Sequence, residues 1–229
     1  MKLPELVENI KSYLYNNREP SSSRLDDRQI IHWINRQRAL WLRREYNQMR
    51  EVRNNEKQIL NNVSLEIIED VNSPIIINSN MSLLRSKYKI PRAIQFHISD
   101  GILAVRGQNK LSERISYTDR ETALYKGNGW FNRKRMFAFK DDDYIWIKYG
   151  SNADKDQIIK YVQVEGVFEN PLEVDVFNGT SFNIKNGVSE YPISAAFMDF
   201  IDSEILKINV QRFVSDGNPN DEEDTVKIN

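Results

Sequence analysis

The stretch DDRQIIHWINRQRALWLRREYN, residues 26–47, decides the fold class because it is the clearest single element in the sequence. Its apolar residues recur at helical spacing, and the two aspartates at its start complement the positive end of a helix dipole. These apolar residues are Ile30, Ile31, Trp33, Ile34, Leu40, Trp41 and Leu42. Because they cover a broad face, we predict a long helix that contacts other elements on more than one side.

Two further helices are predicted near the ends of the chain. The first carries one apolar stripe, formed by Leu3, Leu6, Val7, Ile10 and Leu14, and ends before Pro20. The second follows Pro192 and runs to about residue 214, with Ile193, Phe197, Ile201, Ile205 and Ile208 along one side. No helix has a full core of its own, so we predict that the N-terminal helices and the C-terminal helix pack as a bundle.

The middle of the chain, from about residue 61, changes to the two-residue period of β-strands. Candidate strands are residues 63–71, 75–78, 93–98, 102–105, 115–117, 136–139, 144–149 and 158–167, with a weaker pair at 174–177 and 181–184. Short consecutive strands favour an antiparallel β sandwich or barrel, inserted into the helical bundle of an α+β fold. The expected domains are residues 1–60 (helical), 61–190 (β), 191–215 (the helix completing the bundle) and 216–229 (an extended acidic tail).

Composition excludes several classes of function. The 229 residues contain 32 Lys and Arg against 33 Asp and Glu, a formal charge of -1, and no cysteine. The near-neutral charge does not attract the whole protein to nucleic acid, and the lack of cysteine excludes disulfides, thiolate metal sites and cysteine nucleophiles. We find no secretory signal and no apolar run that could span a membrane, so we expect a soluble protein without a membrane partner.

No group of residues predicts catalysis, and we expect neither a catalytic site nor a metal or other cofactor. His32 and His97 have no second ligand at metal-binding spacing. The aspartates at 141–143 lack the spacing of a calcium loop and are typical of a solvated turn. Motifs of hydrolases, nucleotide-binding loops and zinc peptidases are absent from the sequence.

The long helix also carries the first candidate binding residues, Arg36, Arg38, Arg43 and Arg44, interleaved with Trp33 and Trp41. Arginine suits protein interfaces because its planar guanidinium binds carboxylates in fixed geometry, so we favour salt bridges with a neighbouring subunit or with Asp and Glu of the same fold. A solvated face and contact with DNA phosphates are the alternatives.

A second candidate is the segment 127–135, which combines Trp130, Arg133 and Arg135. Aromatic and basic side chains together can stack on nucleic-acid bases, but Trp and Arg are also frequent anchors of protein contacts. Without another nucleic-acid motif in the chain, we favour the protein contact.

The arrangement resembles a known family. The Leu3-x-x-Leu6-Val7 helix, the run LDDRQIIHWINRQR at 25–38, the strand-rich insertion and the late Tyr191-Pro192-Ile193 helix are similar to head-to-tail connector proteins of short-tailed bacteriophages. These are the adaptor, or tail tubular protein A, type, and the nearest match is to the ring proteins of crAss-like phages.

The resemblance implies a virion structural protein, made in the host cytoplasm, that forms a homo-oligomeric ring, commonly a dodecamer. Such a ring links the portal protein to downstream tail and ring proteins around the DNA channel, with non-specific contact to the DNA. An extended terminus would reach a neighbour, where Val226 and Ile228 add as a short strand, and the acidic tail would oppose the arginine-bearing helix. The alternatives are a nucleic-acid-binding module that uses the same helix and the Trp130 loop, and a glycan-active enzyme.

Overall fold

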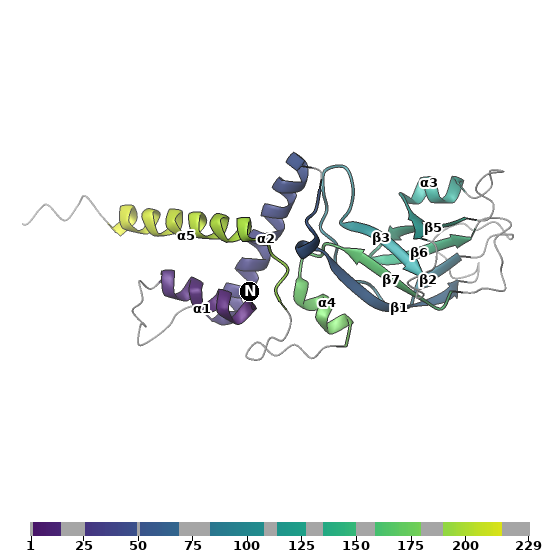
Figure 1. Ribbon diagram of the computed structural model, residues 1–229, viewed down its shortest axis with the longest axis horizontal. Helices are drawn as coiled ribbons and strands as arrows, with labels where there is room; N and C mark the ends of the chain where they lie inside the picture. The colour runs from purple at the N-terminus through teal and green to yellow at the C-terminus, as the bar shows by residue number, and fades with distance from the viewer. Residues whose placement is uncertain are drawn as a thin grey trace, which may run out of the picture. The chain divides into compact units, whose positions relative to one another are not determined.

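The computed structural model describes residues 2–14, 26–49, 51–68, 83–107, 114–126, 135–149, 159–179 and 190–216 (Figure 1). The chain divides into two compact units. The helical unit comprises Met1–Trp41 and Ile184–Asn229, and the barrel unit comprises Leu42–Asn183. The expected domain boundaries at residues 60, 190 and 215 stay a prediction.

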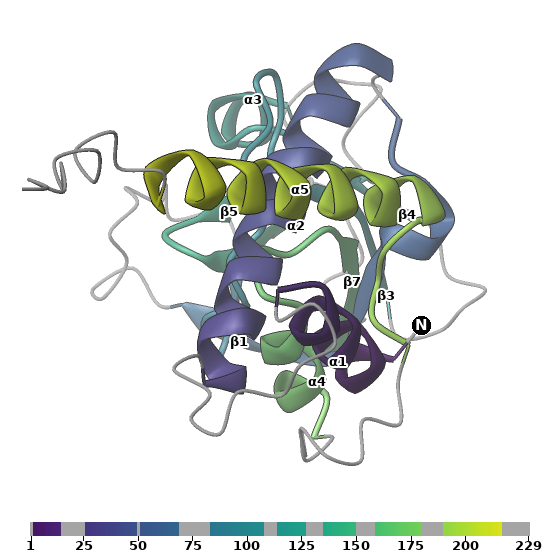
Figure 2. The same ribbon diagram turned by 90° about the vertical axis from the view of Figure 1, so that its left-hand side faces the viewer.

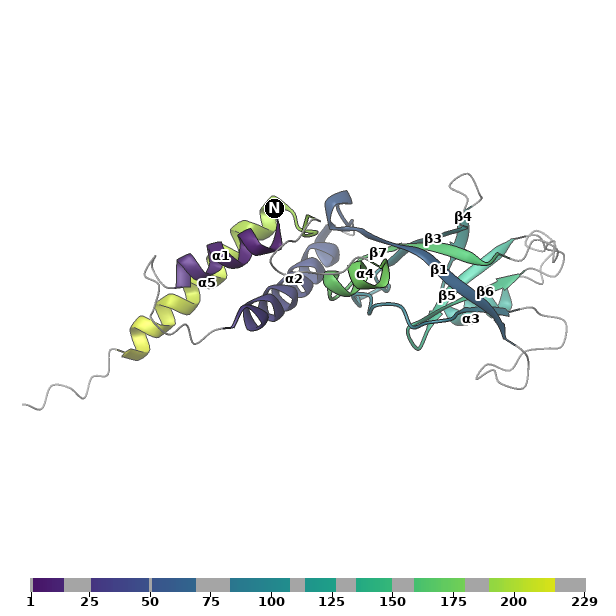
Figure 3. The same cartoon turned by 90° about the horizontal axis from the view of Figure 1, so that it is seen from below.

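The helical unit is built from α1 (Leu3–Leu14), the first part of α2 (Asp27–Met49) and α5 (Ala195–Asp216). All three helices lie where the sequence predicted them, and α1 contacts α5 (Figures 2 and 3). Each helix buries most of the described residues in the apolar stripe that predicted it. The buried residues are Leu3, Leu6, Val7, Ile10, Ile30, Ile31, Ile34, Trp41, Leu42, Phe197, Ile201 and Ile205, whereas Leu40 is exposed. The rings of Trp41 and Phe197 meet edge to face with centroids 5.6 Å apart.

The barrel unit has seven strands in the closed order β1-β2-β6-β5-β4-β3-β7, so the barrel alternative of the prediction is confirmed. The strands are β1 (Gln58–Ile68), β2 (Leu83–Ser86), β3 (Ile102–Gly107), β4 (Arg114–Tyr117), β5 (Met136–Asp141), β6 (Tyr144–Tyr149) and β7 (Tyr161–Gly166), with a short 3-10 helix, η1 (Asn54–Glu56), before β1. The expectation of a purely antiparallel sheet is wrong, because β4 and β5 pair in parallel. A parallel pair needs a crossover connection, and α3 (Arg120–Tyr125) lies in that connection.

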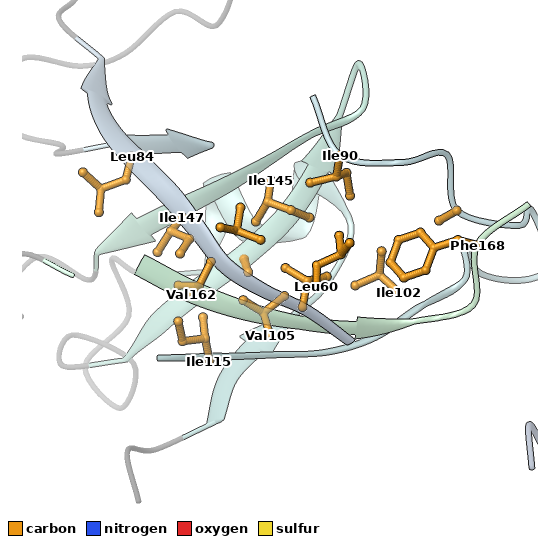
Figure 4. Packing of buried hydrophobic residues seen from close by; sticks show 14 of the residues in the cluster. Leu60, Leu84, Ile90, Ile102, Val105, Ile115, Ile145, Ile147, Val162 and Phe168 are labelled. Carbon is orange, nitrogen blue, oxygen red and sulfur yellow. The ribbon is translucent and has the colours of Figure 1, made fainter. Parts of the chain in front are cut away.

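The barrel interior is filled by alternate residues of its strands, as a two-residue period requires. Ile145, Ile147 and Tyr149 of β6 point into this core together with Val162 and Val164 of β7. Figure 4 shows Ile145, Ile147 and Val162 among the strands, together with Phe168 and Ile90. The interior is therefore a packed core.

A second apolar layer lies on the outer side of β5 and β6, where α3 packs (Figure 1). It contains Phe137, Phe139 and Trp146, which alternate with the residues of the barrel interior, and Ala123 of α3. The fully buried Lys148 donates from Nζ to the carbonyl oxygen of Leu124 in α3, and burial lowers the pKa of its ammonium group. The strand β6 is thus buried on both faces.

The helix α4 (Pro171–Phe177) occupies a region whose residues 174–177 were predicted as a weak strand, and that prediction is wrong. The Asn170 side chain accepts a hydrogen bond from the Leu172 amide, and Pro171 stands in the first turn, which together start a helix. At the other end, the Asn178 side chain accepts from the Asn61 amide at 2.8 Å and donates to the Ile59 carbonyl at 2.9 Å. These bonds tie α4 to the irregular part of β1.

Other strand predictions differ in detail. Residues 93–98 do not form a strand: they make only single bridges at Ala93 and Gln95, because the Ile94 amide donates to the Val167 carbonyl at the end of the barrel. The sequence did not predict β2, which has only four residues. The predicted strands at 75–78 and 181–184 lie outside the described residues.

We expect Ile147→Ala to lower the free energy of unfolding by about 2–5 kcal/mol, because Ile147 is fully buried and the mutation leaves a cavity. The matched control is Ile67→Ala in β1, where the side chain is 57% exposed and the loss should not exceed about 1 kcal/mol. Urea titration followed by circular dichroism measures both. Equal losses would contradict the packed interior.

Candidate functional site

Arg38, one of the candidate interface arginines, is fully buried within the helical unit. Its Nε donates a hydrogen bond to the Pro192 carbonyl at 2.8 Å. The neighbouring Tyr191 is also buried, and its hydroxyl donates to the Asn35 side chain. Burial raises the pKa of the Tyr191 phenol, so it stays protonated and remains a donor. Arg38 and Asn35 therefore hold the segment that leads into α5 against α2.

The other candidate residues in the same part of α2 differ in exposure. Trp41 is buried against Phe197, and Trp33 is half-buried. Arg36 is exposed, two positions along the helix from the buried Arg38. Among these residues, Arg36 and the open part of Trp33 are accessible to a partner.

Arg43 and Arg44 belong to the barrel unit. The Arg43 guanidinium forms an ion pair with Glu169, with Nη2 and Oε1 2.9 Å apart, and both side chains are partly exposed. Arg44 is exposed. Close to them along α2, Tyr46 stacks on Phe96 with ring centroids 4.0 Å apart. The end of α2 is thus fixed to the barrel unit, with Arg44 on its outer surface.

The second candidate segment is described only at its last residue. Arg135 is exposed immediately before β5. Trp130 and Arg133 lie outside the described residues, as do Val226 and Ile228 of the predicted tail contact.

The structure adds a feature that the sequence did not suggest, a cation–aromatic patch formed by Arg85, Lys89 and Tyr144 over the buried Trp146. The Arg85 guanidinium lies over the rings of Tyr144 and Trp146, 4.7 and 5.7 Å from their centroids, and pairs with Glu66 at 2.6 Å. The Lys89 ammonium lies 5.5 Å from the Tyr144 centroid. The patch depends on the register of β2 with β6, in which Arg85 lies opposite Trp146. No local sequence motif predicts that register.

The three aspartates at 141–143 form the turn between β5 and β6, as expected. Asp142 and Asp143 have positive φ angles of 47° and 61°, the conformation of a tight hairpin turn. Each aspartate has its own cation, since Asp141 pairs with Arg120, Asp142 with Lys89 and Asp143 with Lys140. The hydrogen bond from Lys140 lowers the pKa of the Asp143 carboxyl.

Other kinds of site were sought in the same residues. Within the described ranges, no three His, Asp or Glu side chains gather in a way that could hold a metal ion. No helix in the described part of the chain is long and apolar enough to cross a membrane.

Comparison with protein families places this chain among the structural proteins of bacteriophage tails. Residues 5–225 match the family described as Phage tail ring protein 2, one of the crAss ring families, and the chain therefore belongs to that family. The predicted resemblance to the ring proteins of crAss-like phages is thereby confirmed. The family is a structural one and not an enzyme family, and it implies a place in the virion. The comparison with curated proteins returned no match.

We expect Arg38→Met to lower the free energy of unfolding by about 1.5–3 kcal/mol, because the Pro192 carbonyl loses a charged hydrogen-bond donor. The control is Arg36→Met in the same helix, which removes an exposed charge and should change stability by no more than about 0.5 kcal/mol. Urea unfolding monitored by the helical signal in circular dichroism compares them. If the two changes have the same effect, Arg38 does not hold the segment before α5.

Proposed function

We propose that this protein is a connector subunit that forms a closed ring in the tail of a short-tailed phage and links the portal to downstream tail proteins around the DNA channel. The observation that carries the proposal is the family match, which spans residues 5–225 and so includes both units. The subunit would be made in the host cytoplasm and incorporated into the virion.

In this proposal, residues 1–60 and 191–215 form one helical bundle that docks toward the portal, and residues 61–190 form a β domain facing neighbours or the next tail layer. The packing of α1 against α5 supports the first part. The closed barrel supports the second, because it is a compact body that folds around its own core.

A ring requires that each subunit carry two different, complementary surfaces, since identical surfaces would close a dimer. We propose that these surfaces include the residues of α2 that are at least partly exposed, Trp33, Arg36, Arg43 and Arg44. Segment 127–135 would contribute the exposed Arg135, together with Trp130 and Arg133, which lie outside the described residues. Arg38 and Trp41 would act indirectly, by fixing the helix that presents the others.

The size of the ring is a further part of the proposal. We expect twelve copies, matched to the portal, with non-specific contact to the DNA that passes through. The purified protein, alone or mixed with its phage's portal protein, should then form particles of twelve times the 27.0 kDa chain mass. Mass photometry measures the mass, and electron microscopy shows the ring. A chain that stays monomeric with the portal and the other tail proteins would overturn the proposal.

The acidic tail, residues 216–229, is proposed to reach a neighbouring subunit or the portal through Val226 and Ile228. Deletion of residues 217–229 should then reduce the ring fraction at a fixed protein concentration. A control in which Val226 and Ile228 alone become serine separates the apolar contact from the charge of the tail. Unchanged ring assembly in both variants would exclude the tail from the interface.

The second candidate function, a nucleic-acid-binding module, is favoured by one observation, the exposed Arg36 and Arg44 on the same helix. If DNA binding is the main role, affinity for duplex DNA should fall steeply with salt, because phosphate contacts release counterions. Weak binding of the assembled ring that does not depend on these arginines would favour the structural role.

A further inference from the structure

The helical unit carries two exposed stripes of opposite charge on different helices. On α2 the basic stripe consists of Arg28, His32 and Arg36, all exposed. On α5 the acidic stripe consists of Asp199, which is exposed, and Asp202, which is half-exposed. The segregation of charge is notable in a chain whose formal charge is only -1.

Both stripes point away from the core of the helical unit. On α2, His32 and Arg36 each follow a buried isoleucine, Ile30 or Ile34, by two positions, which is about 200° around a helix. On α5, Asp199 follows the buried Phe197 by the same two positions. The basic stripe and Asp199 therefore lie on the sides of their helices opposite to these buried residues, and Asp202 beside them is half-exposed.

The charges in these stripes have no partner in the described part of the chain. Arg28, Arg36, Asp199 and Asp202 form no ion pair among the described residues. The carboxylates of α1 differ in this respect, because Glu8 pairs with Lys11 at 3.3 Å and Glu5 accepts from the Lys2 amide at 3.0 Å. Of α1 and α5, which contact each other, only α5 therefore offers the unpaired carboxylates of such a stripe.

We propose that the basic stripe of α2 on one copy contacts the acidic stripe of α5 on the next copy. This inference rests on the proposed ring, in which each subunit must present two different surfaces that fit each other. Two stripes of opposite charge on helices of one compact unit satisfy that need, and repulsion between like stripes disfavours wrong pairings. Leu40, exposed in line with Arg36, adds an apolar contact between the helices.

The test is a charge swap in the full-length chain. Arg28→Glu with Arg36→Glu should raise the concentration needed for assembly by about tenfold or more, because like charges would then face each other. Asp199→Lys with Asp202→Lys should do the same. All four changes in one chain should restore assembly, since both sides of every contact are then reversed. Circular dichroism of each variant checks that it folds.

A control separates local from total charge. Lys126→Glu with Lys160→Glu changes exposed residues of the barrel unit and shifts net charge as much as the arginine pair does. It should leave assembly unchanged.

The inference is overturned if neither the arginine pair nor the aspartate pair of substitutions weakens assembly. It is also overturned if the variant with all four changes does not recover assembly. If the arginine pair weakens DNA binding and not assembly, the basic stripe binds nucleic acid and the inference fails. Failure of this inference differs from failure of the proposed function. If the wild-type protein and every charge variant form rings, the ring proposal stands and only the contact between these stripes is excluded.

Discussion

The pairing of β1 with β7 is the interaction on which the barrel unit depends, because it joins the first strand to the last and closes the sheet. The register runs from Gln58 opposite Gly166 to Ser64 opposite Tyr161, with an irregularity between Leu60 and Val63. Closure encloses the apolar side chains of seven strands in one core. On its other side β7 pairs with β3, which places the end of β7 beside Gly101, where an added Cβ would lie 2.5 Å from the Val167 carbonyl oxygen. Glycine is required there by the approach of two backbones.

Sequence patterns predicted the elements whose signals are local and strong. The three long helices and strand β6 follow directly from apolar spacing. The two errors in α4 and in residues 93–98 have physical causes. Residues 174–177 alternate in a way that predicts a strand, whereas the Asn170 cap and Pro171 start a helix there. Residues 93–98 alternate as a strand does, but they form no continuous ladder. The Ile94 amide donates to the distant Val167 carbonyl, and the Phe96 amide donates to the nearby Ser99 carbonyl.

The sequence predicted which residues could form the candidate site, but it predicted their exposure only in part. Arg38 follows Ile30 and Ile34 at intervals of four residues, so its burial could have been inferred from helical spacing, whereas treating the arginines as one group concealed it. The cation–aromatic patch could not have been found in this way, because Arg85 meets Trp146 only through the register of β2 with β6. The charged stripes needed the assignment of each helix's buried face, which the structure supplies.

The closed barrel also constrains how copies of the protein can assemble. A sheet with a free edge can recruit the edge of another copy, and that process has no natural end, as in amyloid fibres. Each described strand of this barrel already has a neighbour on both sides. Growth by backbone pairing between barrels is thus blocked, and the number of subunits in an assembly is left to the angle at which side-chain surfaces meet. An angle of suitable size closes a ring after a fixed number of subunits, and assembly then ends.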